Sequence, residues 1–120
     1  MRTSHRLGLV AGLALATPLL ISGCTYTPSP AGTWGEGGEG KPQLVIDEQG
    51  GVGGTDGCNT IVSDWTSAAS GIIFGEVLGT LMYCEGVDTW LLDMKTAVIR
   101  GDELHILDRD GTEIGSLKRQ

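Results

Sequence analysis

From residue 43 onward, short apolar runs alternate with glycine-rich or polar turns, and this spacing limits the folds that the chain can adopt. The runs are 44–47, 60–65, 71–74, 77–84, 97–100, 104–107 and 112–117, and the turn signals are 48–51, 67–70, 101–102 and 109–111. Short strands that recur about every 8 to 12 residues between such turns are typical of an antiparallel sheet or a small barrel. The spacing therefore predicts a mostly β domain.

One segment departs from this spacing. Between Asp88 and Lys95, the apolar residues Trp90, Leu91 and Met94 recur at helical intervals. Asp88 can cap the start of a helix and Lys95 suits its last turn. We expect one short helix here, with its apolar side facing the sheet. The predicted fold class is α+β and mostly β: a small antiparallel curled sheet or open barrel packed around one short helix.

The first 23 residues have a different composition from the rest. They contain Arg2 and Arg6, no acidic residue, and an apolar run from Leu7 to Ile21. A membrane-spanning helix needs about 20 apolar residues. This run is shorter than that, and a Thr-Pro pair interrupts it. A basic start, a short apolar centre and a small-residue exit are typical of a secretory signal peptide. We therefore predict a signal peptide over residues 1–23.

The end of this segment reads Leu20-Ile21-Ser22-Gly23-Cys24, which resembles a bacterial lipobox. The resemblance implies cleavage before Cys24 and attachment of acyl chains, such as palmitate, to that residue. Two or more chains make a stable anchor, whereas one chain binds a membrane only marginally. We expect an exported protein anchored by its N-terminal lipid to the cell membrane or the outer membrane. An ordinary secretory peptide followed by a chance cysteine is the alternative.

Removal of the signal peptide leaves a small acidic chain. All 15 Asp and Glu lie beyond residue 23, with only 6 of the 8 Lys and Arg, so the net charge changes from −7 to −9. Binding to nucleic acid depends on basic contacts to phosphate, and we do not expect it here. Residues 24–33 are rich in Thr and Pro and are predicted to form a lipid-anchored flexible tether. Residues 34–120 are long enough for one domain.

Two glycine clusters resemble phosphate-binding loops only in part. Gly35, Gly37 and Gly40 match G-x-G-x-x-G, but no predicted strand precedes them and no helix follows, so we predict a loop. Residues 50–57 lack the Gly-Lys-Ser or Gly-Lys-Thr ending of a phosphate loop, and predict a turn and a closely approached strand. We expect no cofactor.

Two cysteines, Cys58 and Cys84, lie inside the domain. An exported chain meets oxidising surroundings, which favours a disulfide between them. Buried unpaired thiols are one alternative, and a reactive or metal-binding thiol is another. The mature chain offers only His105 as a basic partner for a thiol, and it has no spacing of ligands typical of zinc. We therefore expect no metal site.

The remaining polar and aromatic residues predict structure rather than chemistry. Asp56 and Asn59 are predicted to bond to the local backbone, and residues 108–111 to form a hairpin turn, because their glycine stands too early for a calcium loop. Period-two alternation places His105 at the surface. The tryptophans are predicted to belong to the core: Trp34, Trp65 and Trp90. With no catalytic residues expected, the protein is predicted not to be an enzyme.

Two motifs carry a resemblance to a known family. Gly57-Cys58-Asn59 is followed by a T-x-M-x-C segment formed by Thr80, Met82 and Cys84. In this order, and with an early Gly-Thr-Trp and a late Asp-Gly turn, they resemble the META domain, the family that includes HslJ-type lipoproteins. The resemblance extends over about 85 residues. It implies a mostly antiparallel β structure around one helix and a disulfide between Cys58 and Cys84, without defined catalytic residues.

The resemblance also implies a role in the bacterial envelope, because members are associated with stress or drug tolerance and secretion. We expect a non-enzymatic, membrane-anchored lipoprotein that binds an envelope protein or maintains the envelope under stress. The alternative is a carrier similar to secretion pilots, which takes an acyl chain or hydrophobic peptide between the sheet and the Trp90 helix. Such a carrier needs an apolar cavity of about 300 Å³ or more.

Overall fold

The computed structural model describes residues 12–14 and 28–120. Cys24 and most of the predicted signal peptide lie outside these residues. Within the described residues, no helix has the length and apolar character needed to cross a membrane.

The described domain is built almost entirely from antiparallel strands. Around the sheet their order is β1-β2-β3-β4-β5-β7-β8-β9, and β6 pairs with β4 outside this path. The strands are β1 (Gly32–Trp34), β2 (Gln43–Ile46), β3 (Gly51–Thr55), β4 (Thr60–Ala68), β5 (Gly71–Phe74), β6 (Leu78–Gly79), β7 (Thr96–Arg100), β8 (Glu103–Leu107) and β9 (Glu113–Lys118). The mostly β, antiparallel prediction is therefore confirmed.

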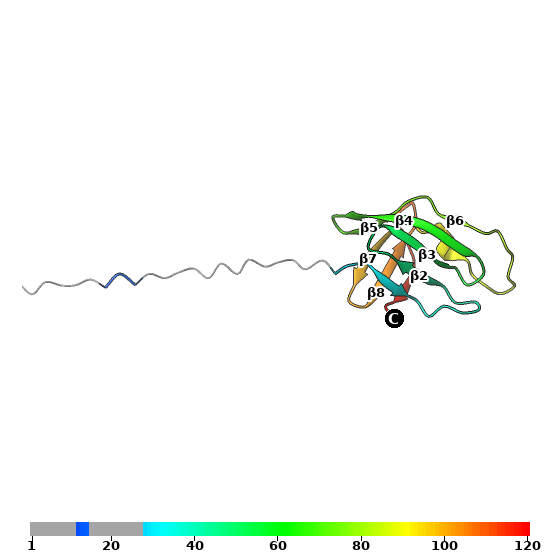
Figure 1. Cartoon of the computed structure of the whole chain (residues 1–120), viewed down its shortest axis with the longest axis horizontal. Helices are drawn as coiled ribbons and strands as arrows, with labels where there is room; N and C mark the ends of the chain where they lie inside the picture. The colour runs from blue at the N-terminus through cyan, green and yellow to red at the C-terminus, as the bar shows by residue number, and fades with distance from the viewer. Residues whose placement is uncertain (1–11, 15–27) are drawn as a thin grey trace, which may run out of the picture.

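Contacts between the first and last strands nearly close the sheet into a barrel (Figure 1). Trp34 forms a β-bridge with Arg119, and the Gln120 N–H donates to the carbonyl of Thr33 at 2.9 Å. Side chains that alternate along the strands fill the interior, as period-two patterning requires. The buried apolar core is Trp34, Leu44, Ile46, Val52, Ile61, Ile72, Phe74, Leu91, Met94, Ala97, Leu104, Ile106 and Leu117.

The glycine run at 50–57 forms a turn followed by β3, as predicted. The reason for a glycine is clearest at Gly54, whose φ is +156°. A Cβ at this position would lie 2.0 Å from the carbonyl oxygen of Gln43 on β2. Only a residue without a side chain permits the two backbones to approach so closely.

The prediction of a helix between Asp88 and Lys95 is wrong. The segment forms a four-residue 3₁₀ turn, η1 (Trp90–Asp93), and Asp88 does not cap it. The preceding Thr89 makes no side-chain capping bond, and Met94 is already extended, with ψ at 134°. So short a segment does not gain enough hydrogen bonds to offset helix nucleation.

The apolar face predicted for this segment is nevertheless correct. Leu91 and Met94 are buried in the core, and Trp90 is partly buried against it. The ring of Trp90 covers β9 so closely that a Cβ on Gly115 would lie 2.5 Å from it. Side-chain burial therefore holds the segment in place without a regular helix.

The prediction of a strand over residues 77–84 is also largely wrong. Only Leu78 and Gly79 form β6, and residues 80–84 are irregular. The backbone groups of Met82 do not pair with a neighbouring strand, because they bond to the side chain of Asn59. A side chain thus replaces the strand partner at this point.

The folded unit begins earlier than residue 34. Thr33 belongs to β1, and the guanidinium of Arg119 donates to the carbonyls of Ser29 and Ala31, both at 2.9 Å. The indole of Trp34 donates to the carbonyl of Pro30 at 2.8 Å. Residues 29–33, predicted as part of the tether, therefore lie on the barrel.

Candidate functional site

Three loops meet at one end of the barrel (Figure 1). They are residues 35–42 between β1 and β2, residues 56–59 between β3 and β4, and residues 80–89 between β6 and η1, which we call the distal loop. The first two are joined by a hydrogen bond from the Gly40 N–H to the carbonyl of Gly57 at 3.0 Å. Both family motifs recognised in the sequence, G-C-N and T-x-M-x-C, lie in these loops.

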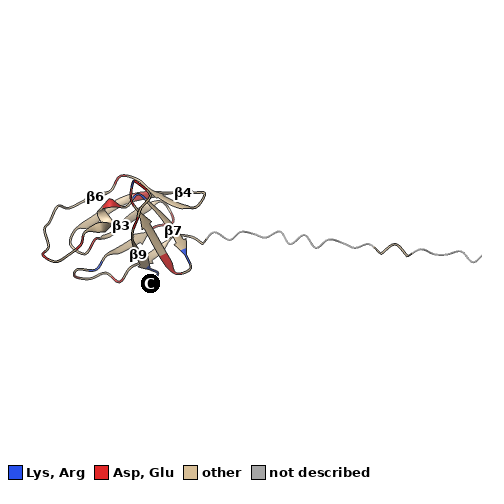
Figure 2. Cartoon of the chain, turned by 180° about the vertical axis from the view of Figure 1, so that it is seen from behind, with Lys and Arg blue, Asp and Glu red and all other residues tan. Residues whose placement is uncertain are grey.

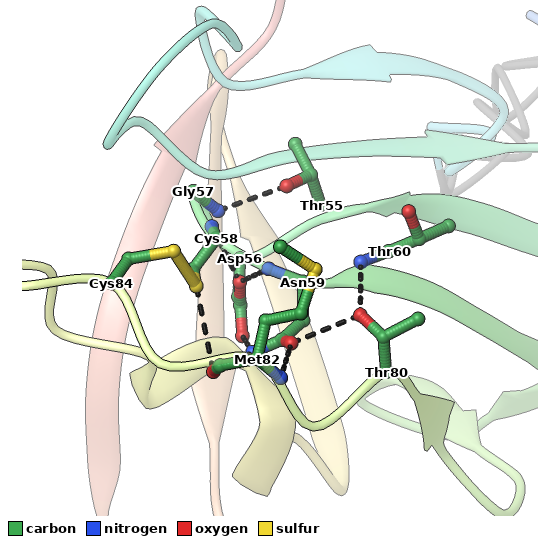
Figure 3. The surroundings of a disulfide bond; sticks show 9 residues. All are labelled: Thr55, Asp56, Gly57, Cys58, Asn59, Thr60, Thr80, Met82 and Cys84. Carbon is green, nitrogen blue, oxygen red and sulfur yellow. Dashed lines mark hydrogen bonds between the residues drawn. A yellow bond between two sulfur atoms is a disulfide. The ribbon is translucent and has the colours of Figure 1, made fainter.

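Asp56 organises the 56–59 turn from inside. Its side chain is fully buried, and Oδ1 accepts hydrogen bonds from the backbone N–H groups of Cys58 at 2.8 Å and Asn59 at 2.5 Å. Its other oxygen, Oδ2, accepts from the side-chain amide of Asn59 at 3.2 Å (Figure 3). The local bonding predicted for Asp56 is confirmed.

Asn59 does more than the local bonding predicted for it. Its Oδ1 accepts a hydrogen bond from the hydroxyl of Thr80 at 2.9 Å and another from the N–H of Met82 at 2.6 Å. Its Nδ2 also lies 3.4 Å from the Met82 carbonyl, which accepts from it. Asn59 is 2% exposed, and these bonds are partly buried between it and the exposed distal loop (Figure 3). No local pattern in the sequence could show a partner more than 20 residues away.

The disulfide is the second attachment of the distal loop. Cys58 and Cys84 are bonded, with their Cα atoms 5.8 Å apart, so the pairing expected from the sequence is present and the free-thiol alternatives are not. Cys58 Sγ lies 3.5 Å from the Met82 carbonyl. A disulfide sulfur has no hydrogen to donate, so this is a packing contact. Adjacent residues of the G-C-N motif thus hold the T-x-M-x-C motif at two points.

The side chains between these attachments face the solvent. Leu81 is 95% exposed, Met82 60% and Tyr83 88%. Leu78 on β6 and Val62, its partner on β4, are exposed beside them. Most large exposed apolar residues of the described chain therefore gather at or next to the distal loop. Exposed apolar side chains that gather in one region in this way usually mark an interaction site.

The charges around this end are mainly negative. Within the three loops, Glu36, Glu39, Glu85 and Asp88 are exposed, and Lys41 is the one basic residue. Lys41 is already paired with Glu36, with 2.9 Å between Nζ and Oε2. The hydrogen bond from Lys41, and then its charge, hold the pKa of Glu36 below its ordinary value. Of these four carboxylates, only Glu36 forms an ion pair with another described residue.

His105, the one histidine of the predicted mature chain, lies elsewhere. It is partly exposed on β8, between Glu103, with 3.2 Å from Nε2 to Oε2, and Glu113 on β9. The hairpin turn predicted after β8 is confirmed, because Asp108 Oδ1 accepts from the N–H groups of Asp110 and Thr112 at 2.9 and 3.0 Å. The distal loop does not include either feature.

The tryptophans and the first glycine cluster occupy structural positions. Trp34 is fully buried, and Trp65 and Trp90 are partly buried against the core. Gly35, Gly37 and Gly40 lie in the loop between β1 and β2, as predicted. None of these residues contributes an exposed surface comparable to that of Leu81 and Tyr83.

One cleft lies between the segment that precedes β6, the end of η1 and the β8–β9 turn, and has a volume of about 580 Å³. Charged side chains of both signs border it, beside a few apolar ones. It is lined by Gly75, Glu76, Val77, Leu92, Asp93, Met94, Lys95, Asp108, Arg109 and Asp110. No group of His, Cys, Asp or Glu in the described part of the chain is arranged to hold a metal ion.

Comparison with known proteins identifies one family. The model of the META domain family matches residues 26–120, which include all strands of the described residues and both motifs of the distal end. No curated protein and no solved structure matches the chain. From this match over most of its length, the chain belongs to the META domain family.

Proposed function

We propose that this protein is a non-enzymatic, membrane-anchored lipoprotein of the bacterial envelope whose META domain binds another protein. The proposed binding role rests on the apolar tip of the distal loop, which is formed by Leu81, Met82 and Tyr83. These side chains are exposed although the loop that bears them is fixed by a buried amide and a disulfide. A fixed loop loses little conformational entropy when it binds.

The anchoring role is supported by the sequence before the domain. A signal-peptide pattern ends at Cys24, and Ser29 is already bonded to Arg119 on the barrel. The intervening chain, from Cys24 to residue 28, spans at most about 18 Å at 3.6 Å per residue. A lipid on Cys24 would hold the domain close to the membrane surface.

The carrier alternative receives less support. It requires a cavity between the sheet and the segment around Trp90, but the Trp90 ring packs directly on Gly115 of β9. The nearby cleft of about 580 Å³ is bordered by Glu76, Asp93 and Lys95 among other charged residues. An acyl chain requires an apolar lining.

Anchoring and binding can be tested in the same cells. The wild-type protein is expected in the membrane fraction, with an acylated Cys24 peptide detected by mass spectrometry, and Cys24→Ala is expected in the soluble fraction. Chemical cross-linking of intact cells is expected to give a discrete protein adduct. Leu81→Ser should reduce that adduct, while Val45→Ser, which removes an exposed apolar side chain on β2, should not. Membrane retention of Cys24→Ala would contradict lipid anchoring, and equal adducts in both loop and control variants would contradict the binding role.

A further inference from the structure

We infer that the tip of the distal loop inserts into an apolar hollow of a partner protein, bordered by Lys or Arg, on the side facing away from the anchoring membrane. The tip consists of Leu81, Met82 and Tyr83, and its acidic border of Glu85 and Asp88. This inference rests on the proposed function and adds the partner's chemistry and position.

The distal loop presents exposed side chains on a fixed backbone, so we expect it to insert into a partner and not to receive one. Leu81 and Tyr83 are 95% and 88% exposed, so nearly all of their surface is available for burial by a partner. Met82 between them is held through both backbone groups by Asn59, and Cys84 follows immediately in the disulfide. An aromatic and an aliphatic side chain on a fixed backbone are typical anchors for a pocket on another protein.

The position of the loop argues against the anchoring membrane as the surface that it binds. Figures 1 and 2 show the distal loop at one end of the barrel and the start of β1 at the other. β4 runs between these ends: it begins at Thr60, next to Asn59, and its nine residues extend about 30 Å at 3.3 Å per residue. Ser29 is bonded at the opposite end, through Arg119, whose N–H donates to Asp102 in the β7–β8 turn. A tether of at most about 18 Å holds that end at the membrane, and the length of β4 separates the loop from it.

The charges beside the tip indicate which of the remaining kinds of partner it binds. Glu39, Glu85 and Asp88 are exposed in these loops and form no ion pair with another described residue, and Lys41 is engaged by Glu36. A second copy of this chain would bring the same carboxylates together, and an anionic lipid surface would also repel them. A protein with basic residues around its apolar hollow is complementary to both the tip and its border.

The inference can be tested with the full-length lipoprotein in intact cells. A benzophenone amino acid introduced in place of Tyr83 is expected to form a protein adduct on illumination, and the same amino acid in place of Asp102, at the opposite end, is not. Leu81→Ser, and separately Glu85→Lys with Asp88→Lys, should each lower the yield about fivefold or more, as loss of an interface anchor does. Val45→Ser is the matched control and should leave the yield unchanged. Mass spectrometry of the adduct should place Lys or Arg beside the cross-linked site.

Four results would overturn the inference: a lipid adduct at position 83, an adduct between two copies of this chain, an acidic border on the cross-linked partner, or no adduct at position 83. Fractionation of the same cells tests the proposed function independently. A membrane-bound protein without an adduct at position 83 overturns the docking inference alone. A soluble wild-type protein overturns the anchoring.

Discussion

The side-chain amide of Asn59 engages both backbone hydrogen-bonding groups of Met82: Oδ1 accepts from the Met82 N–H at 2.6 Å, and Nδ2 lies 3.4 Å from its carbonyl oxygen. An amide is suited to this role because it carries an acceptor and a donor side by side. It imitates the edge of a neighbouring strand at the point where β6 has ended. An exposed apolar loop thereby obtains a defined backbone position without burying its own side chains.

Asn59→Ala should lower the free energy of unfolding by about 2–3 kcal/mol, because it removes several partly buried hydrogen bonds and leaves Asp56 with fewer donors. Urea denaturation under non-reducing conditions measures the loss. Asn59→Asp is the matched variant: it keeps the size but places a second carboxylate against buried Asp56, so it should be less stable than Asn59→Ala at neutral pH. A wild-type urea midpoint for either variant would contradict this role.

Loss of the disulfide should destabilise the domain through the unfolded state. The bond joins residues separated by 26 positions, and closing a loop of that size contributes about 3–4 kcal/mol in the chain-entropy model. The double variant Cys58→Ser with Cys84→Ser is expected to unfold at correspondingly lower urea concentration. Reductant should shift the wild-type midpoint in the same direction and leave the double variant unaffected.

Gly115→Ala tests the contact that holds the 3₁₀ segment on the sheet. The added methyl group would lie 2.5 Å from the Trp90 ring, so the ring must move, at a loss of about 1–3 kcal/mol in stability. A change in tryptophan fluorescence should accompany the loss. Gly51→Ala on β3 is the matched control, because its methyl group would meet nothing closer than 3.7 Å. Equal effects of the two substitutions would refute the proposed packing.

Arg119→Ala should open the seam between β1 and β9. The guanidinium carbon lies 4.0 Å from the centroid of the Trp34 ring, and the group also donates to two carbonyls at the start of the domain. We expect a loss of about 2 kcal/mol and faster hydrogen exchange at the amide of Gln120, which donates to Thr33. Arg119→Lys should recover only part of the loss, because lysine keeps the charge but not the planar fork.

Lys41→Gln should raise the pKa of Glu36 toward its ordinary value. Lys41 holds this pKa low first by its hydrogen bond and then by its charge, and the substitution removes the charge. Carbon-13 NMR titration of the Glu36 carboxyl measures the change, with Glu39 as the reference in the same loop. Both residues are exposed, so we expect no measurable change in stability. A Glu36 pKa equal in the two proteins would contradict the ion pair.

Local patterns were sufficient for much of the fold. Alternating burial identified the strands around Leu44, Phe74 and Leu104, and the Asp108 turn followed from its Asp and Gly residues. The prediction of a helix at Trp90 used the right spacing of buried residues, but their burial is satisfied by a 3₁₀ turn against Gly115. Spacing reports which side chains are buried and does not report how many backbone hydrogen bonds a segment can form.

The antiparallel strands and the hairpin turns follow from composition and periodicity, because they depend on interactions between near neighbours. The disulfide between Cys58 and Cys84 is favoured only by the further expectation that the chain is exported and that Cys24 carries lipid. The candidate site does not follow from composition or periodicity. The bonds of Asn59 to Thr80 and Met82, and the exposure of Leu81 at the end opposite Ser29, depend on segments that the barrel brings together. Such contacts form only when strand pairing has closed the chain between them, so no pattern along the chain encodes them directly.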